Sequence, residues 1–294
     1  MLPELEYVRP ASLSEALTAL RDFPGRSYAL AGGTDLLISL RNRRLEAPLR
    51  LVDVSRLPEL CQIREENGTV VLGGCVTHSR LVNSPVVQQY LPVLAEAAAA
   101  IGSEQIRNRG TLGGNLCNAS PCADTAPALL VLNAEVEIAS TEGGRRLSLA
   151  DFLQAPYRTA LQPGELLVSV HCEKLPEDAG CAFLKLGRRS AMSIARINVA
   201  AVLGFGDYGE IADARLAAGS IMPRTARLHS AEKTMMGETP SDELFRAVGD
   251  FVAKEMIATA GRRWSTPYKK KVVPVLVQRV LSKALISRER EERD

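Results

Sequence analysis

The sequence predicts an α+β fold of two domains, and three observations carry this prediction. Helices and strands alternate in short pieces up to about residue 55. Hairpin signals then replace them, including an Asn67-Gly68 pair between two apolar runs. A further group of apolar strands begins after a turn-rich segment at 176–180 and is followed by three helical patterns. We therefore expect a first domain at 1–175, with subdomains at about 1–55 and 56–175, and a carboxy-terminal domain at 180–294.

The composition is that of an ordinary globular protein. The 294 residues are 46% hydrophobic and 24% charged, with a net charge of +2. Only 4% are aromatic, and no Lys/Arg-rich face interleaved with aromatic residues is evident, so a nucleic-acid partner is not expected. The N-terminus has no signal-peptide pattern and no apolar run reaches membrane-spanning length, so we expect a cytoplasmic protein.

The first subdomain is expected to alternate between helix and strand. Ser12 or Ser14 can cap a helix through Leu20, because its apolar residues share one face. The elements predicted after it are a strand at 27–31, a Gly32-Gly33 turn, a helix that Thr34 and Asp35 cap and that runs to about Arg44, and a strand at 50–54.

The second subdomain is expected to contain hairpins and buried helices. Thr77 can cap a short helix, and the alanine-rich run 92–101 predicts a buried helix because its apolar faces are too broad for a surface helix. Asp124 is placed to cap a helix to Leu132, with Pro127 in the first turn. The predicted strands are 62–64, 70–75, 135–139, 146–149 and 166–171.

The carboxy-terminal domain is expected to pair a three-stranded antiparallel sheet with three helices. The run 204–209 matches G-x-G-x-x-G, but a strand pattern follows it, so it predicts a hairpin turn rather than a dinucleotide site. The charged run 287–294 is expected to be a solvated helix end or a disordered tail. The predicted strands are 182–186, 194–205 and 211–217, and the predicted helices are 226–236, 241–256 and 267–286.

Two glycine-containing stretches are candidate anion sites. In 27–35, a buried strand, paired glycines and a helix N-terminus would aim unpaired N–H groups and the helix dipole at one point. In 102–130, the run 110–115 (GTLGGN) is rich in glycine, which leaves the backbone accessible to a ligand, and Asp124 follows it. Either stretch alone also suits a simple chain reversal. Together they predict that a pyrophosphate is held from both sides, with each charge-assisted hydrogen bond contributing about 1.5–3 kcal/mol.

Histidine and cysteine show no metal-site spacing. His78, His171 and His229 are far apart, and His78 is expected either near a ligand or on the surface. Cys117 and Cys122 form a C-x4-C pair with no second pair nearby, so we interpret them as small residues that line the loop.

Three stretches resemble the signature motifs of one family. They are AGGTDLL at 31–37, IRNRGTLGGNLCNASPCADTAPALL at 106–130 and KLGRRSAMSIARINVA at 185–200. They look like those of the FAD-binding medium subunits of the molybdenum hydroxylases, such as xanthine, carbon monoxide and nicotinate dehydrogenases. This chain departs from many members at Tyr28, where they carry Lys, and at Ser193, where they carry Asp.

The resemblance implies a fold and a set of cofactor residues. The fold is the FAD-binding fold of the vanillyl-alcohol oxidase type, with two subdomains, followed by a smaller α+β domain. Asp124 would bind a hydroxyl of the cofactor, and Leu167 and Lys185 would lie by the isoalloxazine, where a cation stabilises the reduced anion. The implied phosphate-binding residues are Tyr28, Ala29, Leu30, Ala31, Gly32, Gly33, Thr34 and Asp35 in the first loop and Thr111, Gly113, Gly114 and Asn115 in the second.

The resemblance also implies partners. A large subunit would hold the molybdenum cofactor, a small subunit would hold two 2Fe-2S clusters, and FAD on this chain would pass electrons to NAD⁺ or another acceptor. No insertion for a further cluster is present, which favours FAD as the redox centre of this chain. Two alternatives stay open: a stand-alone FAD oxidoreductase, and a scaffold subunit without flavin.

Overall fold

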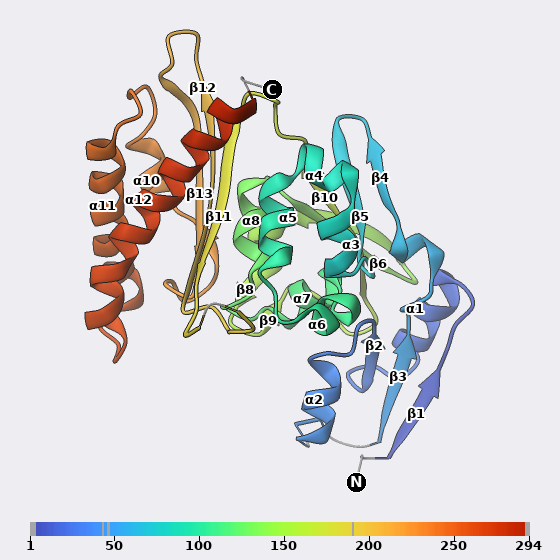
Figure 1. Cartoon of the computed structure of the whole chain (residues 1–294). Coiled ribbons are helices and arrows are strands. Elements are labelled where there is room, and N and C mark those ends of the chain that lie inside the picture. The colour runs from blue at the N-terminus through green and yellow to red at the C-terminus, as the bar shows by residue number, and fades with distance from the viewer. Residues whose placement is uncertain (1–3, 43, 46–47, 190, 292–294) are drawn as a thin grey trace.

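The computed structural model describes residues 4–42, 44–45, 48–189 and 191–291. Residues 292–294 of the charged terminal run and Ser190 of the third signature stretch lie outside this description. Figure 1 shows the arrangement of the elements. In chain order these are β1 (Leu5–Val8), α1 (Leu13–Arg21), β2 (Ser27–Leu30), α2 (Leu36–Arg41), β3 (Leu49–Asp53), the 3-10 helix η1 (Pro58–Cys61), β4 (Ile63–Glu66), β5 (Thr69–Gly73), α3 (His78–Asn83), α4 (Pro85–Tyr90), α5 (Pro92–Ala99), α6 (Glu104–Arg109), α7 (Leu112–Asn118), α8 (Thr125–Val131), β6 (Glu135–Ser140), β7 (Gly143–Ser148), α9 (Leu149–Phe152), β8 (Leu153–Ala155), β9 (Arg158–Thr159), β10 (Leu166–Glu173), β11 (Gly180–Leu186), β12 (Ile197–Phe205), β13 (Ile211–Gly219), β14 (Ala226–Arg227), α10 (His229–Lys233), α11 (Asp242–Ala260) and α12 (Thr266–Glu291).

The first subdomain is a three-stranded parallel sheet in the order β1-β3-β2. Helix α1 begins as predicted, with the Ser12 hydroxyl accepting the Glu15 N–H at 3.2 Å. Strand β1 is an addition to the prediction, because a four-residue edge strand leaves too short a periodic signal. Helix α2 ends at Arg41 rather than near Arg44.

A buried carboxylate stands at the end of β3. The Asp53 carboxylate accepts hydrogen bonds from the Ser55 hydroxyl at 2.6 Å and the Ser55 N–H at 3.0 Å. The Tyr7 hydroxyl and the Arg9 guanidinium donate to its other oxygen, the latter at 3.1 Å. Burial raises the pKa of Asp53, but these hydrogen bonds outweigh burial and hold the pKa at about 2. The ionised carboxylate therefore stabilises the folded chain.

We predict that Asp53→Asn lowers the free energy of unfolding by about 2 kcal/mol at pH 7. The folded pKa of about 2 lies below the ordinary value of 3.8, so the stabilisation is complete above 3.8 and is lost as the pH falls toward 2. Urea unfolding at two pH values tests this: the difference between wild type and variant should shrink to about 1 kcal/mol at pH 3. An equal difference at both pH values would show that the charge is not responsible.

The second subdomain is a five-stranded antiparallel sheet in the order β4-β5-β10-β6-β7. Helices α3, α4, α5, α7 and α8 cover one face and bury the main core with it (Figure 1). The β4–β5 turn has Asn67 and Gly68 at φ of 46° and 81°, which confirms the predicted hairpin. Thr77 caps α3 as expected, through the Arg80 N–H. The strands predicted at 135–139 and 146–149 pair as the β6–β7 hairpin, and β7 begins earlier, with Gly143 and Gly144 paired to Ser140 and Ala139.

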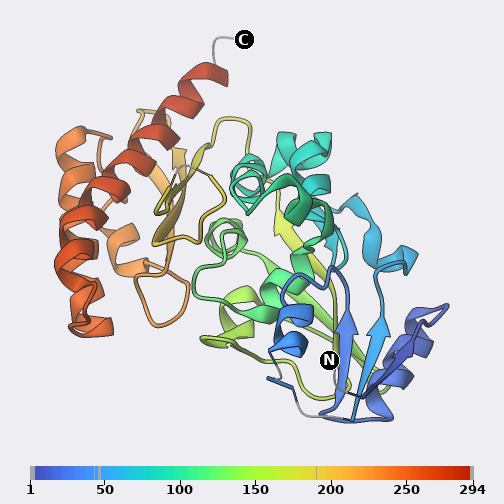
Figure 2. The ribbon, with the colours of Figure 1, turned by 60° about the horizontal axis from the view of Figure 1, so that its bottom comes forward.

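The carboxy-terminal sheet lies between two helical layers, as Figure 2 shows. Alternate residues of β12 face opposite sides: Val199 and Leu203 pack against α11 and α12, and Ala200 and Val202 face the core of the first domain. The sheet has the order β11-β12-β13-β14 and therefore four strands, not the predicted three. Its fourth strand occupies residues 226–227, where a helix was predicted, so α10 is correspondingly short.

A further prediction is tested by this domain. The Gly206 N–H donates to the Glu210 carbonyl at 2.9 Å between the antiparallel strands β12 and β13, so the G-x-G-x-x-G run is a hairpin turn as expected. Residues 174–179 connect β10 to β11, and the domain boundary there stays a prediction. Of the helices among residues 4–291 that the structure describes, none is long and apolar enough to span a bilayer.

Candidate functional site

The two glycine stretches lie against each other. A Cβ built on Gly32 would stand 2.1 Å from the Arg109 carbonyl oxygen and 3.0 Å from Gly110 Cα. Helix α2, which follows the first stretch, lies beside α6 and α7 in both ribbon views (Figures 1 and 2). Only glycine allows this approach, because the neighbouring atoms are backbone. The tertiary fold thus brings together the two stretches that the sequence analysis paired.

The first stretch keeps a row of backbone donors free. Within the described part of the chain, the N–H groups of Gly32, Gly33, Thr34 and Asp35 have no acceptor. They precede the first turn of α2, so its dipole reinforces them. Asp35 is the N-cap residue of α2, in line with the predicted cap, but its side chain caps no N–H group. This row of donors suits an anion.

The second stretch is different from what its composition suggested. Residues 112–118 are helix α7, and the four N–H groups from Leu112 to Asn115 all donate within the chain. Gly113, for example, donates to the Gly74 carbonyl at 2.9 Å, and a Cβ there would stand 2.6 Å from the same oxygen. This glycine therefore allows α7 to approach the end of β5. The expectation that its N–H group is a free donor is wrong, because that group is bound to the Gly74 carbonyl.

His78 lies beneath this stretch and is not a surface residue. His78 is 2% exposed, and its backbone N–H donates to the Gly110 carbonyl at 3.0 Å. Gly110 also packs on the imidazole ring. Burial, with a smaller effect of Arg107, lowers the pKa of His78 to about 4, so the ring is neutral at pH 7. Among the described residues its Nδ1 atom has no partner. The surface alternative is therefore excluded, and a place near a ligand is retained.

Asp124 and Lys185 form a buried ion pair between the two domains. Their Oδ2 and Nζ atoms are 2.5 Å apart, and the other Asp124 oxygen accepts from Asn198 Nδ2 at 2.9 Å. Burial raises the pKa of Asp124, and Lys185 and Asn198 partly offset this. Asp124 begins α8 as predicted, but its side chain does not cap that helix. Asn198 was missed, although a polar residue within the apolar strand run 197–205 was a usable signal.

Lys185 has one N–H donor that is bound to none of the described residues. Its ammonium group has three N–H donors, of which Asp124 and the Ala100 carbonyl, at 2.9 Å, use two. A cavity of about 410 Å³ adjoins it, lined by α5, β11 and the connection to β12, including Arg189 and Ser193. Leu167 is buried in β10 next to a β-bulge, and a Cβ built on Gly74 would stand 2.7 Å from its carbonyl oxygen.

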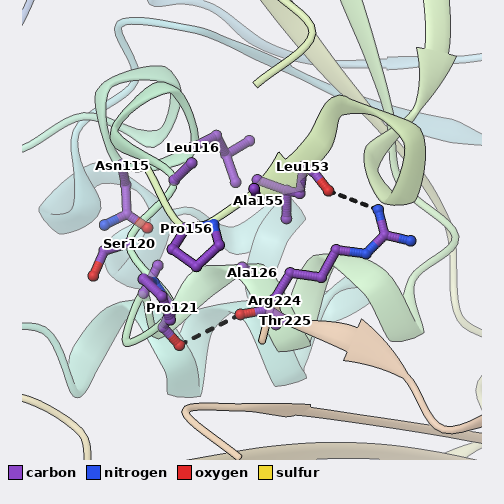
Figure 3. A pocket seen from close by; sticks show the side chains of 12 residues that line it. Asn115, Leu116, Ser120, Pro121, Ala126, Leu153, Ala155, Pro156, Arg224 and Thr225 are labelled. Atoms are coloured by element: carbon purple, nitrogen blue, oxygen red, sulfur yellow. Dashed lines mark hydrogen bonds between the residues drawn. The ribbon is translucent and has the colours of Figure 1, made fainter. Parts of the chain in front are cut away.

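A second, smaller pocket lies beside α7 and Asn115. Figure 3 shows Arg224 reaching from the carboxy-terminal domain to the Leu153 carbonyl, to which it donates at 2.8 Å, and Thr225 beside Pro121. Asn115 uses its Oδ1 atom to accept from Thr125 at 2.6 Å. The contacts of Arg224 with Leu153 and of Thr225 with Pro121 join the carboxy-terminal domain to the first domain.

Comparison with known proteins agrees with this arrangement. The profile of the FAD binding domain in molybdopterin dehydrogenase matches residues 3–174, and that of the CO dehydrogenase flavoprotein C-terminal domain matches residues 182–284. The chain superposes with a TM-score of 0.91 on a chain of carbon monoxide dehydrogenase from Hydrogenophaga pseudoflava, at 30% identity and covering 98% of this chain and 99% of that one.

Relatives found by sequence align with this chain over nearly its whole length and nearly all of their own. Subunit alpha of the 6-hydroxypseudooxynicotine dehydrogenase complex of Paenarthrobacter nicotinovorans is 33% identical over 283 residues, which are 96% of this chain and 95% of that protein. The xanthine dehydrogenase FAD-binding subunit of Escherichia coli O157:H7 is 33% identical over 281 residues, 95% of each chain. The fold, both profiles and these relatives together confirm that the chain belongs to the FAD-binding medium subunits of the molybdenum hydroxylases.

Proposed function

We propose that this chain holds FAD between its two glycine stretches and the Asp124–Lys185 pair. The observation that carries the proposal is the row of four N–H groups, from Gly32 to Asp35, which have no acceptor among the described residues and begin where Gly32 packs against the second stretch. Each can donate a charge-assisted hydrogen bond to a pyrophosphate oxygen, contributing about 1.5–3 kcal/mol. The proposed site residues are Tyr28, Ala29, Leu30, Ala31, Gly32, Gly33, Thr34, Asp35, Thr111, Gly113, Gly114, Asn115, Asp124, Leu167 and Lys185.

The side chains of Asn115 and Lys185 would contact other parts of the cofactor. Asn115 has its Oδ1 atom engaged, so its amide N–H donors are left for the cofactor. The third N–H of Lys185 is directed by two fixed hydrogen bonds and offers a positive charge to the isoalloxazine. FAD, when bound, supplies the capacity to accept and release electrons singly or in pairs. Burial around Lys185 strengthens its electrostatic effect on that chemistry.

We further propose that the chain works in a complex. Its relatives include a carbon monoxide dehydrogenase medium chain and a subunit of a dehydrogenase complex, and this chain covers nearly their full length. By this likeness a small subunit with two 2Fe-2S clusters delivers electrons, a large subunit carries the molybdenum cofactor and the substrate, and NAD⁺ receives the electrons. A quinone or another carrier is the alternative acceptor.

The test is to purify the chain from its native host without stripping it, and to identify released flavin and bound subunits. We expect FAD together with an iron-containing and a molybdenum-containing subunit, and reduction of NAD⁺ by the reduced complex. FAD without partners would favour the stand-alone oxidoreductase. Partners without flavin, even after incubation with FAD, would favour the scaffold alternative.

Gly114→Arg tests the position of the cofactor. Gly114 is exposed at the start of α7, and its Cβ would lie 2.9 Å from the Thr111 hydroxyl, so a long side chain projects from the second stretch. We expect loss of bound flavin, measured by the absorbance of released FAD near 450 nm. Gly144→Arg, on the exposed strand β7, is the matched control and should retain flavin. Retention of flavin by Gly114→Arg would place the site elsewhere.

A further inference from the structure

The carboxy-terminal helices carry a strong charge asymmetry. Residues 256–288 include no Asp or Glu, and they hold eight cationic side chains. Because the whole chain has a net charge of +2, these eight cations leave a net charge of −6 for the remainder. Such a separation of charge within one chain indicates a surface with a specific electrostatic task.

Four of these cations lie at the turn from α11 to α12, and with two aromatic residues they form a cluster that we call the basic corner. The cations are exposed and, within the described structure, no carboxylate lies within 4.0 Å of any of them. Two aromatic residues accompany them, with exposed fractions of 87% for Trp264 and 41% for Tyr268. Trp264 is the one tryptophan of the chain. The basic corner consists of Arg262, Arg263, Trp264, Tyr268, Lys270 and Lys271.

The outer face of α12 continues the basic corner. Tyr268, Lys271, Val275, Arg279 and Ile286 follow one another at helical spacing, all exposed, and extend over about 27 Å. The inner face of α12 is buried against the sheet and α11. This outer face therefore alternates apolar and cationic side chains, all of them at least partly open to solvent. The sequence analysis found no Lys/Arg-rich face interleaved with aromatic residues, and the run 262–271 corrects that expectation, since it holds the whole basic corner.

Contacts link the basic corner to the cofactor end of the molecule. Arg196, just before β12, lies over the Tyr268 ring at 5.3 Å, and Lys269 donates to the Ser220 carbonyl. Burial lowers the pKa of Lys269, and Arg263 and Arg196 lower it further, as expected where positive charge is crowded. The connection from β11 to β12 that contains Arg196 also lines the cavity beside Lys185, and it exposes Ile194.

We propose that the basic corner and the outer face of α12 are the docking surface for an acidic protein partner, a subunit of the complex described above. This inference rests on the proposed function. The exposed apolar residues between the cations, Val275 and Ile286, suit a protein surface better than a nucleic acid, whose outer surface is a row of phosphates. A symmetric dimer through this surface would oppose like charges, so a second copy is disfavoured.

The decisive experiment compares two charge-matched triple variants of the tagged full chain in its native host. The corner variant is Arg262→Glu/Arg263→Glu/Lys270→Glu. The control variant is Arg246→Glu/Lys254→Glu/Lys233→Glu, which changes three exposed cations elsewhere in the same domain. We expect the corner variant to recover at least ten-fold less iron and molybdenum per chain than wild type at 0.1 M salt, and the control variant to match wild type. Both should keep FAD and the wild-type melting temperature.

A second measurement covers the case in which the corner variant is unstable. Hydrogen exchange of residues 262–271 should be slower in the wild-type complex than in the free chain. Unchanged exchange, or equal partner recovery by the two variants, would overturn the docking proposal while leaving the proposed function intact. A wild-type chain that carries FAD without partners would instead contradict the proposed function.

Trp264 fluorescence tests the other polyanions on the free chain. The probes are a 20-nucleotide oligothymidylate and vesicles of phosphatidylcholine and phosphatidylglycerol. We expect neither to shift the emission at 0.1 M salt, where exposed charges are screened beyond about 10 Å. A blue shift with either probe, combined with undiminished partner recovery by the corner variant, would assign the surface to that ligand and refute a protein partner.

Discussion

Gly32→Ala is expected to release FAD from the chain. The added Cβ would stand 2.1 Å from the Arg109 carbonyl oxygen, and both neighbouring groups are backbone, so the two stretches must move apart. If two of the N–H groups between Gly32 and Asp35 then miss the pyrophosphate, each lost charge-assisted hydrogen bond weakens binding by about 1.5–3 kcal/mol. The affinity for FAD should fall by roughly 10²–10⁴-fold.

The measurement is a titration of the flavin-free chain with FAD, followed by flavin fluorescence. Overpacking of this kind also destabilises a protein by about 1–3 kcal/mol, so urea unfolding should accompany the titration. Gly144→Ala is the matched control, because its Cβ would come no closer than 3.3 Å to the Ile138 carbonyl oxygen. Wild-type affinity in Gly32→Ala would mean that the contact between the stretches does not shape the cofactor site.

Asp124→Ala is expected to lower the free energy of unfolding by about 3–5 kcal/mol, because it leaves the buried Lys185 ammonium without its counter-charge. It also removes one of the two acceptors of Asn198 Nδ2, leaving the Ala123 carbonyl oxygen at 3.1 Å. Lys185→Met should cost less, because the carboxyl group left behind can take up a proton. The two single variants and the double variant form a cycle that isolates the coupling between the side chains. Additive effects would show that the pair contributes no coupling energy.

The pH dependence of Lys185→Met gives this prediction a second readout. Without Lys185, burial dominates and holds the folded pKa of Asp124 above the ordinary value of 3.8. A raised folded pKa contributes stability that is present below pH 3.8 and is lost as the pH rises through the folded value. Relative to wild type, Lys185→Met should therefore lose stability as the pH rises above 3.8. Lys185→Met/Asp124→Asn, which lacks the carboxyl group, should not show this loss.

Local patterns in the sequence predicted most of the elements. The Asn67-Gly68 hairpin is set by two residues that adopt positive φ, and helix α12 is set by an apolar stripe in which Val273, Val280 and Ala284 are all buried. The strand β12 was readable from its continuous apolar run. In each case the determining interactions lie within a few residues along the chain, or repeat with the period of the element.

The predictions that differ from the structure have a common cause, which is contact between residues far apart in the sequence. The run GTLGGN leads into helix α7, and Gly113 allows that helix to approach Gly74, which directly follows β5. The added strands β1 and β14 are too short to have a period and exist because β3 and β13 offer them edges. His78 is buried because the Gly110 segment folds over it.

By itself, then, the sequence determined the order of the elements, the two glycine stretches and, through its motifs, the family. Only the tertiary structure decided which N–H groups remain free, that Asp124 meets Lys185, and that the basic corner faces outward. The physical reason is that hydrogen-bond satisfaction, desolvation and charge pairing depend on atoms brought together from distant parts of the chain, whereas helix and strand periodicity depends on neighbours.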